Sequence, residues 1–269
     1  MHLIHIKLKP TTKIDLNFDT SEIGKGIQSP NAAIEESKEY LKSNKHSDFY
    51  NKDLMVVANQ QLIFVFDYAI GKEKILIPEI NPTTIFYSNA IMSHRRLVSF
   101  KKDLFENSPT VKNLNKRVNP TLFGNFFQLA SNCIINLQAA LESFANRQIP
   151  VNHTFMDING KEFEPSVFHK LDKALPEIKG KRFKSKFKKY NFLVRKVIEL
   201  RNEIIHLTPI EETTNTKYKS TYRKLLSFNY SEAIISVEKL INFYEPDLIE
   251  KCECGKEMYY DIEERFDSK

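Results

Sequence analysis

The chain has 269 residues, 41% of them hydrophobic, which is enough to bury a core in one or two domains. Its seven glycines and the absence of tryptophan argue against a β-barrel or a glycine-rich nucleotide-binding fold. The formal net charge of +6 is mildly basic, so it permits a polyanionic partner without requiring one.

The three cysteines are too few for a disulfide framework and fit a reducing compartment. Cys133 lies within an apolar run of helical period, which predicts a core thiol. Cys252 and Cys254 form a short Cys-x-Cys turn, but no second ligand pair completes a zinc site, so we expect no metal and no cofactor. The first residues lack the apolar segment of a signal peptide, and no apolar run is long enough for a membrane helix. We therefore expect a cytoplasmic protein with no membrane association.

At the N-terminal end, alternating apolar residues predict a β-hairpin formed by residues 2–9 and 13–18, and residues 31–43 have the pattern of a helix. Residues 53–72 carry an apolar stripe of helical period with Gly71 as a cap, although their central cluster fits a buried strand equally well. We favour the helix because the stripe holds for the full length, and we expect residues 74–78 to be an extended linker.

A composition shift at residues 78–82 marks the predicted domain boundary. It separates an α+β region of unknown role at residues 1–78 from a helical bundle at residues 79–248. A charged tail at residues 249–269 follows, with a further helix from residue 258 onward. The predicted fold is therefore mainly α, an up-and-down helical bundle with a small N-terminal α+β region that contains a β-hairpin.

Two long amphipathic helices open the bundle, and each begins with an Asn-Pro pair, a typical start signal. The first runs from Pro82 to about residue 106. The second runs from residue 119 to about 147 and should be central. A short helix at residues 165–174 is expected to stop before Pro176. Two closing helices are expected at residues 218–226 and 230–244.

The stretch from Lys184 to Pro209 predicts a long amphipathic helix that ends at the Thr208-Pro209 pair. Its buried edge should comprise Val194, Ile198 and Ile205, widened by Ile204.

The last turns of this helix carry Arg201, Asn202 and His206. Five positions of an unbroken helix place Arg201 and His206 roughly 140° apart, so the two side chains point away from each other. Fraying at His206, or a two-fold axis that faces two helix ends, would bring the guanidinium and the imidazole together.

This Arg-Asn-x-x-x-His arrangement at a helix end resembles the Arg-x4-His motif of HEPN domains, over about residues 80–247. HEPN domains are helical bundles and often metal-independent endoribonucleases. The resemblance also implies that Glu142, in the second long helix, packs against Arg201 as a bidentate carboxylate. It further implies a homodimer with a composite cleft, and RNA cleavage that leaves a 2′,3′-cyclic phosphate. Proteins of this type act as toxins, sometimes silenced by an antitoxin or regulatory protein, or in antiviral defence.

The residue types suit this chemistry. His206 can take the 2′-hydroxyl proton, Arg201 can bind the phosphate, and Asn202 can orient either group. A basic run with interleaved aromatic residues precedes the motif helix, and it is the feature that favours RNA as the partner. Its cations are Lys181, Arg182, Lys184, Lys186, Lys188 and Lys189. The alternatives are a solvated basic face and a catalytically inactive HEPN-like module, in which Arg201 and His206 only tie helix ends together.

Overall fold

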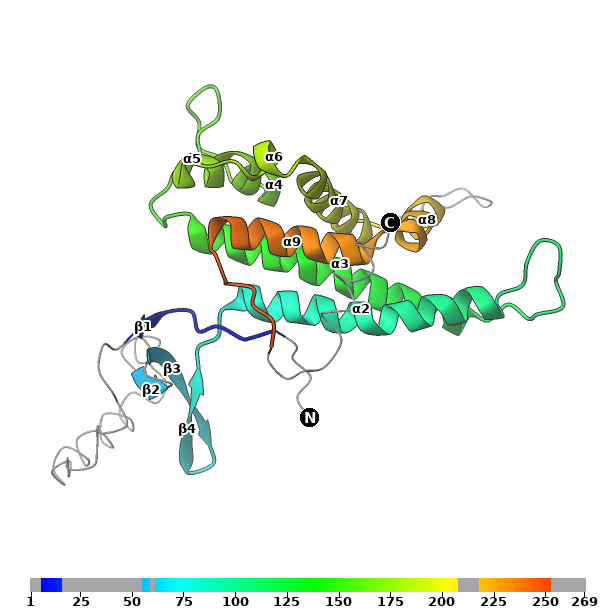
Figure 1. The fold of residues 1–269 in the computed structure, drawn as a ribbon, viewed down its shortest axis with the longest axis horizontal. Coiled ribbons are helices and arrows are strands. Elements are labelled where there is room, and N and C mark those ends of the chain that lie inside the picture. Colours follow the sequence, from blue (N-terminus) through cyan, green and yellow to red (C-terminus); the bar gives the residue numbers. More distant parts are fainter. Residues whose placement is uncertain (1–5, 16–54, 59–60, 208–217, 253–269) are drawn as a thin grey trace, which may run out of the picture. The chain divides into compact units, whose positions relative to one another are not determined.

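The computed structural model describes residues 6–15, 55–58, 61–207 and 218–252 (Figure 1). The chain divides into two units. One comprises Leu8–Asn81, and the other runs from Pro82 onward and includes Ile6 and Lys7. The helices predicted at residues 31–43 and 258–269 lie outside the described residues.

The smaller unit is built on an antiparallel sheet whose strands are β1 (Lys13–Asp15), β2 (Met55–Ala58), β3 (Gln61–Ile70) and β4 (Glu73–Pro78). The long strand β3 pairs with the other three. Its first half lies between β1 and β2, with Ile63 opposite both Lys13 and Val56. Its second half forms a hairpin with β4, from the Val65–Pro78 pair to the Ile70–Glu73 pair.

The helix predicted over residues 53–72 is wrong, and the linker predicted at residues 74–78 is the strand β4. β-Branched and aromatic residues dominate β3, and such side chains fit a pleated strand better than a helix. Gly71 has φ +60°, so it occupies the two-residue turn of a hairpin rather than a helix cap. Of the hairpin predicted from residues 2–9 and 13–18, the described residues Lys13–Asp15 pair with β3, and residues 2–5 and 16–18 lie outside the described residues.

The larger unit is mainly helical, as predicted. Its longest helices are α2 (Pro82–Asn107) and α3 (Pro120–Gln148), which lie antiparallel in Figure 1. α3 begins where the sequence indicates, because the side chain of Asn119 accepts a hydrogen bond from the N–H of Thr121. The helices α7 (Lys188–Ile205), α8 (Tyr218–Ser227) and α9 (Tyr230–Tyr244) complete the bundle.

The connection between α3 and α7 is more helical than predicted. It contains α4 (Val167–His169), a π-helical turn η3 (Lys170–Ala174), α5 (Leu175–Lys179) and α6 (Phe183–Lys186). Pro176 does not end the helix, because it lies in the first turn of α5, where a missing N–H is tolerated.

The predicted helix from Lys184 is broken at Phe187, whose backbone is not helical (φ −130°, ψ 61°), and it ends at Ile205. It is therefore shorter at both ends than the sequence suggests.

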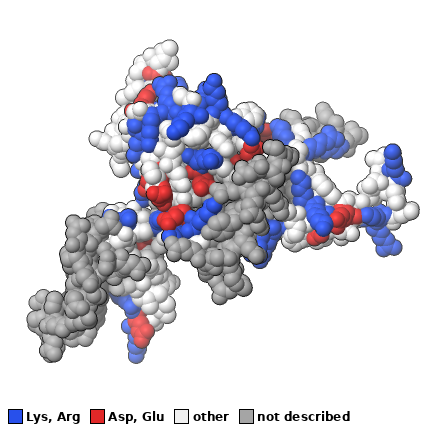
Figure 2. All heavy atoms as spheres, in the orientation of Figure 1, with Lys and Arg blue, Asp and Glu red and all other residues white. Residues whose placement is uncertain are grey.

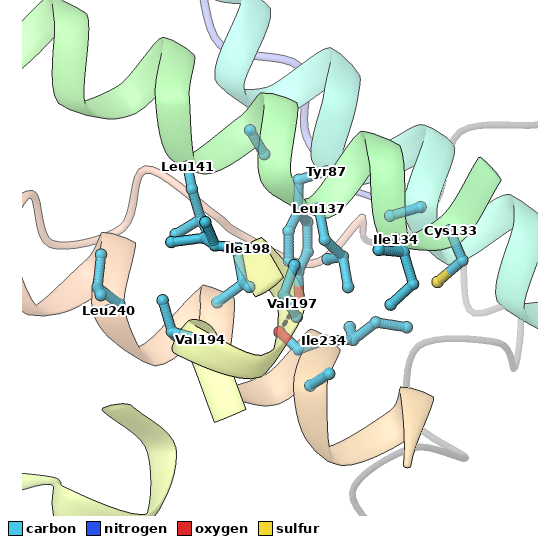
Figure 3. Close-up of a cluster of buried hydrophobic side chains, with 14 of the residues drawn as sticks. Tyr87, Cys133, Ile134, Leu137, Leu141, Val194, Val197, Ile198, Ile234 and Leu240 are labelled. Atoms are coloured by element: carbon cyan, nitrogen blue, oxygen red, sulfur yellow. Dashed lines mark hydrogen bonds between the residues drawn. The ribbon is translucent and has the colours of Figure 1, made fainter. Parts of the chain in front are cut away.

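The core of the bundle lies where α3, α7 and α9 meet (Figure 3). Tyr87 of α2 reaches into it and donates its hydroxyl hydrogen to the carbonyl of Ile234 at 3.2 Å. The prediction of a core thiol at Cys133 is confirmed, since the residue is fully buried. The other residues labelled in this cluster are apolar: Ile134, Leu137, Leu141, Val194, Val197, Ile198 and Leu240.

The predicted buried edge of α7 is confirmed at Val194, Ile198 and Ile204 but is wrong at Ile205, which is 49% exposed. Each helical residue turns about 100° from the last, so Ile205 faces away from the side on which Ile204 is buried. None of the helices in the described residues has a stretch long and apolar enough to cross a membrane.

Candidate functional site

The C-terminal end of α7 carries the candidate catalytic residues. His206 follows the last helical residue with a non-helical backbone (φ −104°, ψ 36°), and its N–H donates to the carbonyl of Asn202 at 3.0 Å. The side chains of Asn202 and His206 are both exposed. His206 is therefore the C-cap residue of α7, and its imidazole is exposed at the helix end.

Arg201 is half-buried and its guanidinium is poorly satisfied. Its Nη1 donates to Oδ1 of Asn202 at 3.3 Å, while its Nε is buried without a hydrogen-bond partner. In the described ranges no carboxylate forms an ion pair with Arg201. Because the buried Nε cannot reach a ligand, it is the Nη groups of Arg201 that remain able to bind an anion such as a phosphate.

Glu142 is not the partner of Arg201 in this structure. Its carboxylate accepts a hydrogen bond from Nε2 of Gln138, one turn earlier on α3, at 2.8 Å. The predicted pairing of Glu142 with Arg201 is therefore not formed among the described side chains. Spacing within one helix fixes which residues share a face, whereas packing between helices decides which face meets the next helix.

Glu203, the acidic residue between Arg201 and His206, interacts with α8. Glu203 accepts a hydrogen bond from Nζ of Lys224 at 2.6 Å and one from the hydroxyl of Thr221 at 3.4 Å. These contacts tie α8 to the end of α7. A cavity of about 380 Å³ lies beside them, between α7 and α8, but Arg201, Asn202 and His206 do not line it.

Three of the six cations proposed to bind RNA interact with the protein itself. Lys181 donates to the carbonyl of Phe243 at 2.6 Å and lies 4.9 Å from the centre of its ring. Lys186 lies 5.4 Å from the ring centre of Phe187. Lys189 forms an ion pair with Glu232, whose hydrogen bond and charge raise the pKa of this lysine.

The other three cations, Arg182, Lys184 and Lys188, form no ion pair in the part of the chain that the structure describes. They line a cavity of about 320 Å³ beside α5, α6, the start of α7 and the end of α9. Figure 2 shows lysine and arginine gathered over this part of the molecule. Two buried residues of the same cavity, Asn191 and Tyr244, were not predicted, because nothing in the sequence distinguishes them from other polar residues of amphipathic helices.

The cavity and the motif lie at opposite ends of α7. At 1.5 Å per residue, Lys188 and His206 are separated by roughly 27 Å along the helix axis. The basic residues of one subunit therefore do not surround the motif of the same subunit.

No cluster of three or more His, Cys, Asp or Glu side chains with the arrangement of a metal site occurs within the described ranges. Cys254 lies outside them. A comparison with protein-family profiles, with curated proteins and with solved structures found no match for this chain. Its function therefore has to be inferred from the chemistry of its own residues.

Proposed function

We propose that the protein is a metal-independent endoribonuclease of the HEPN type. The observation that carries the proposal is the end of α7. There the exposed imidazole of His206 and the exposed amide of Asn202 share one helix end with Arg201, which has no acidic partner among the described residues. The resemblance of these residues to the Arg-x4-His motif supports the same conclusion.

Cleavage would proceed by attack of a ribose 2′-hydroxyl on the adjacent phosphorus. One His206 accepts the 2′-hydroxyl proton as the new P–O bond forms, and the bond from phosphorus to the 5′-oxygen breaks. The departing 5′-oxygen takes a proton from a second imidazole or from water. Arg201 offsets the charge that builds on the phosphate oxygens, and Asn202 orients the phosphate or the imidazole. The products are a 2′,3′-cyclic phosphate and a 5′-hydroxyl.

A homodimer would supply the second imidazole by facing two α7 ends across a two-fold axis. Within one subunit, roughly 27 Å along α7 separates the unpaired cations from the motif. A dimer would add the unpaired cations of the second subunit to the surface that a bound RNA strand can contact. A toxin or antiviral defence role, held in check by an antitoxin or regulatory protein, is part of this proposal.

A purely structural role for the motif is less consistent with the contacts. Residues that tie helix ends together bond to other elements, whereas the hydrogen bond recorded for the Arg201 side chain goes to the next residue on the same helix. His206 has no side-chain hydrogen bond within the described ranges. The alternative, an inactive HEPN-like binding module, predicts folded protein that binds RNA without cutting it.

The test is cleavage of end-labelled RNA by the wild-type protein and by His206→Ala. Loss of a general base reduces cleavage by about 10²-fold or more, while the melting temperature stays unchanged because the imidazole is exposed. The matched control is His153→Ala, which removes a half-exposed histidine that packs on Phe155 in the 149–164 loop. A wild-type protein that leaves RNA intact, or a His206→Ala variant that cuts at the normal rate, would overturn the proposal.

A further inference from the structure

The cavity beside the start of α7 contains two buried polar side chains. Asn191 and Tyr244 are each only 6% exposed, and both line it. The side chain of Asn191 makes no hydrogen bond to any described residue. The amide atoms of Asn191 are not sealed from the cavity, so water or a ligand there can satisfy them.

Tyr244 also has a hydrogen-bonding group to offer. Its oxygen accepts a hydrogen bond from the N–H of Phe183 at 3.3 Å, which leaves its own O–H free to donate. Burial raises the pKa of Tyr244, so the hydroxyl keeps its proton under ordinary conditions. The two buried groups of the cavity therefore both provide donors.

The charge of the cavity is positive. Arg182, Lys184 and Lys188 line it without ion-pair partners among the described residues. The one carboxylate in its lining, Asp172, is neutralised by an ion pair with Arg195.

The helix α7 adds further donors at the same place. It begins at Lys188, and its N-cap residue, Phe187, provides no side-chain cap. The first-turn N–H groups of a helix lack partners within the helix and carry partial positive charge, which favours an anion.

We propose that this cavity is a binding site for a phosphate group, held by the three cations and by the donors of Asn191 and Tyr244. A volume of about 320 Å³ lies at the lower end of the range for small-molecule sites. It suits a compact phosphorylated molecule, such as a mononucleotide, or the phosphate at the 5′ end of an RNA. The proposal does not depend on RNA cleavage, because the cavity is at the other end of α7 from His206.

The test uses the full chain carrying His206→Ala, so that RNA remains intact. Binding is measured by calorimetry with inorganic phosphate, with a nucleoside 5′-monophosphate and with the matching nucleoside. It is measured by fluorescence anisotropy with one short RNA that has either a 5′-phosphate or a 5′-hydroxyl. Ionic strength is kept constant with chloride, since the attraction of cations for any anion is screened by salt.

The matched variants lie two residues apart. Lys184→Gln removes a cation that lines the cavity, whereas Lys186→Gln removes one that does not. A charge-assisted hydrogen bond contributes about 1.5–3 kcal/mol, so Lys184→Gln should weaken phosphate binding by about tenfold or more, and Lys186→Gln by less than about twofold. Tyr244→Phe, which removes one hydroxyl and keeps the ring, should weaken it as well.

Preference for the 5′-phosphorylated RNA over its 5′-hydroxyl form would identify an RNA end as the ligand. Binding of the mononucleotide without that preference would identify a small molecule. Equal losses in Lys184→Gln and Lys186→Gln would overturn the proposal, because they would indicate general electrostatic attraction. Equal binding of nucleoside and nucleotide, or no binding of phosphate by the folded protein, would overturn it as well.

The phosphate site and the proposed RNA cleavage are tested separately, so either can fail without the other. Cleavage of RNA by the protein that retains His206 is measured independently of phosphate binding in the His206→Ala background.

Discussion

Replacing Arg201 with methionine should stabilise the protein while removing its activity. The Nε of Arg201 is buried without a partner, and an unsatisfied buried donor costs about 1–3 kcal/mol. Methionine keeps a flexible unbranched chain without the buried donor. The exposed Asn202, which loses a 3.3 Å hydrogen bond, can bond to water instead. We expect the free energy of unfolding to rise by about 1 kcal/mol, and the melting temperature by roughly 2–4 °C for a protein of this size.

Arg195 provides the control, since it lies on the same helix and its Nε is also buried without a partner. Its guanidinium, however, pairs with Asp172 and lies 4.3 Å from the ring centre of Phe168. The side chains of the ion pair are 32% and 18% exposed, so the pair is partly screened. Arg195→Met removes both contacts and leaves a carboxylate unpaired, so it should lower the free energy of unfolding by about 1–2 kcal/mol.

The two variants are compared by urea unfolding followed by circular dichroism, and by cleavage of the same labelled RNA. The expected result is opposite signs of the stability change, together with loss of cleavage in Arg201→Met. If Arg201→Met loses as much stability as Arg195→Met, Arg201 has a structural role and the reasoning fails. If Arg201→Met cuts RNA at the normal rate, the proposed phosphate contact is refuted.

Three further predictions concern the bundle. Leu137→Ala in the core should cost about 2–5 kcal/mol in urea unfolding, whereas Leu114→Ala, at a residue that is 76% exposed, should change stability by less than about 0.5 kcal/mol. Asn229→Ala removes the side chain that accepts from the N–H of Glu232 at the start of α9, and should cost about 1 kcal/mol by the same measurement. Burial raises the pKa of Tyr230 above the usual value of about 10, so the unfolded chain ionises first. The buried hydroxyl of Tyr230 therefore contributes its full share of the folding stability below about pH 10, and this share is lost as the pH rises further. Above that pH, the urea midpoint of Tyr230→Phe should depend less on pH than that of the wild-type protein.

The long helices could be predicted because burial repeats along them for many turns. In α3 the buried residues Phe126, Cys133, Leu137, Leu141 and Phe144 follow one face over most of the helix. The Asn-Pro pair at its start is a local signal for the first residue of the helix, and the helix begins there in the structure. A pattern of this length is difficult to produce with any other element.

The sheet could not be predicted in the same way. β3 is only ten residues long, and Val65 is its one fully buried residue, so no strict alternation marks it. A short apolar run with intermediate burial satisfies a helical stripe by chance. Gly71 is equally suitable for a helix end and for a hairpin turn, because both need a positive φ. What decided between them was pairing with β1, β2 and β4, and the periodicity of one segment does not record the strands with which it pairs.

In the candidate site, too, residues on one helix could be placed from the sequence, whereas contacts between helices could not. Arg201, Asn202 and His206 lie on one helix end, so the sequence alone could place them together. Glu142 was predicted to meet Arg201 through contact between two helices, and its carboxylate pairs within α3 instead. The donors of Asn191 and Tyr244 converge from α7 and α9, which no local pattern records.

The basic run shows why charge in a sequence is a poor guide to a binding surface. Six cations in nine residues have the same formal charge, yet the folded chain gives them different partners. Lys181 binds a carbonyl near the end of α9, and Lys189 pairs with Glu232 of that same helix. The cations that line the cavity, Arg182, Lys184 and Lys188, form no ion pair among the described residues. They lie near the first turn of α7, whose N–H groups lack partners within the helix. Since α9 is about fifty residues further along the chain, a substitution there can change which lysines are available to an anion without changing the basic run.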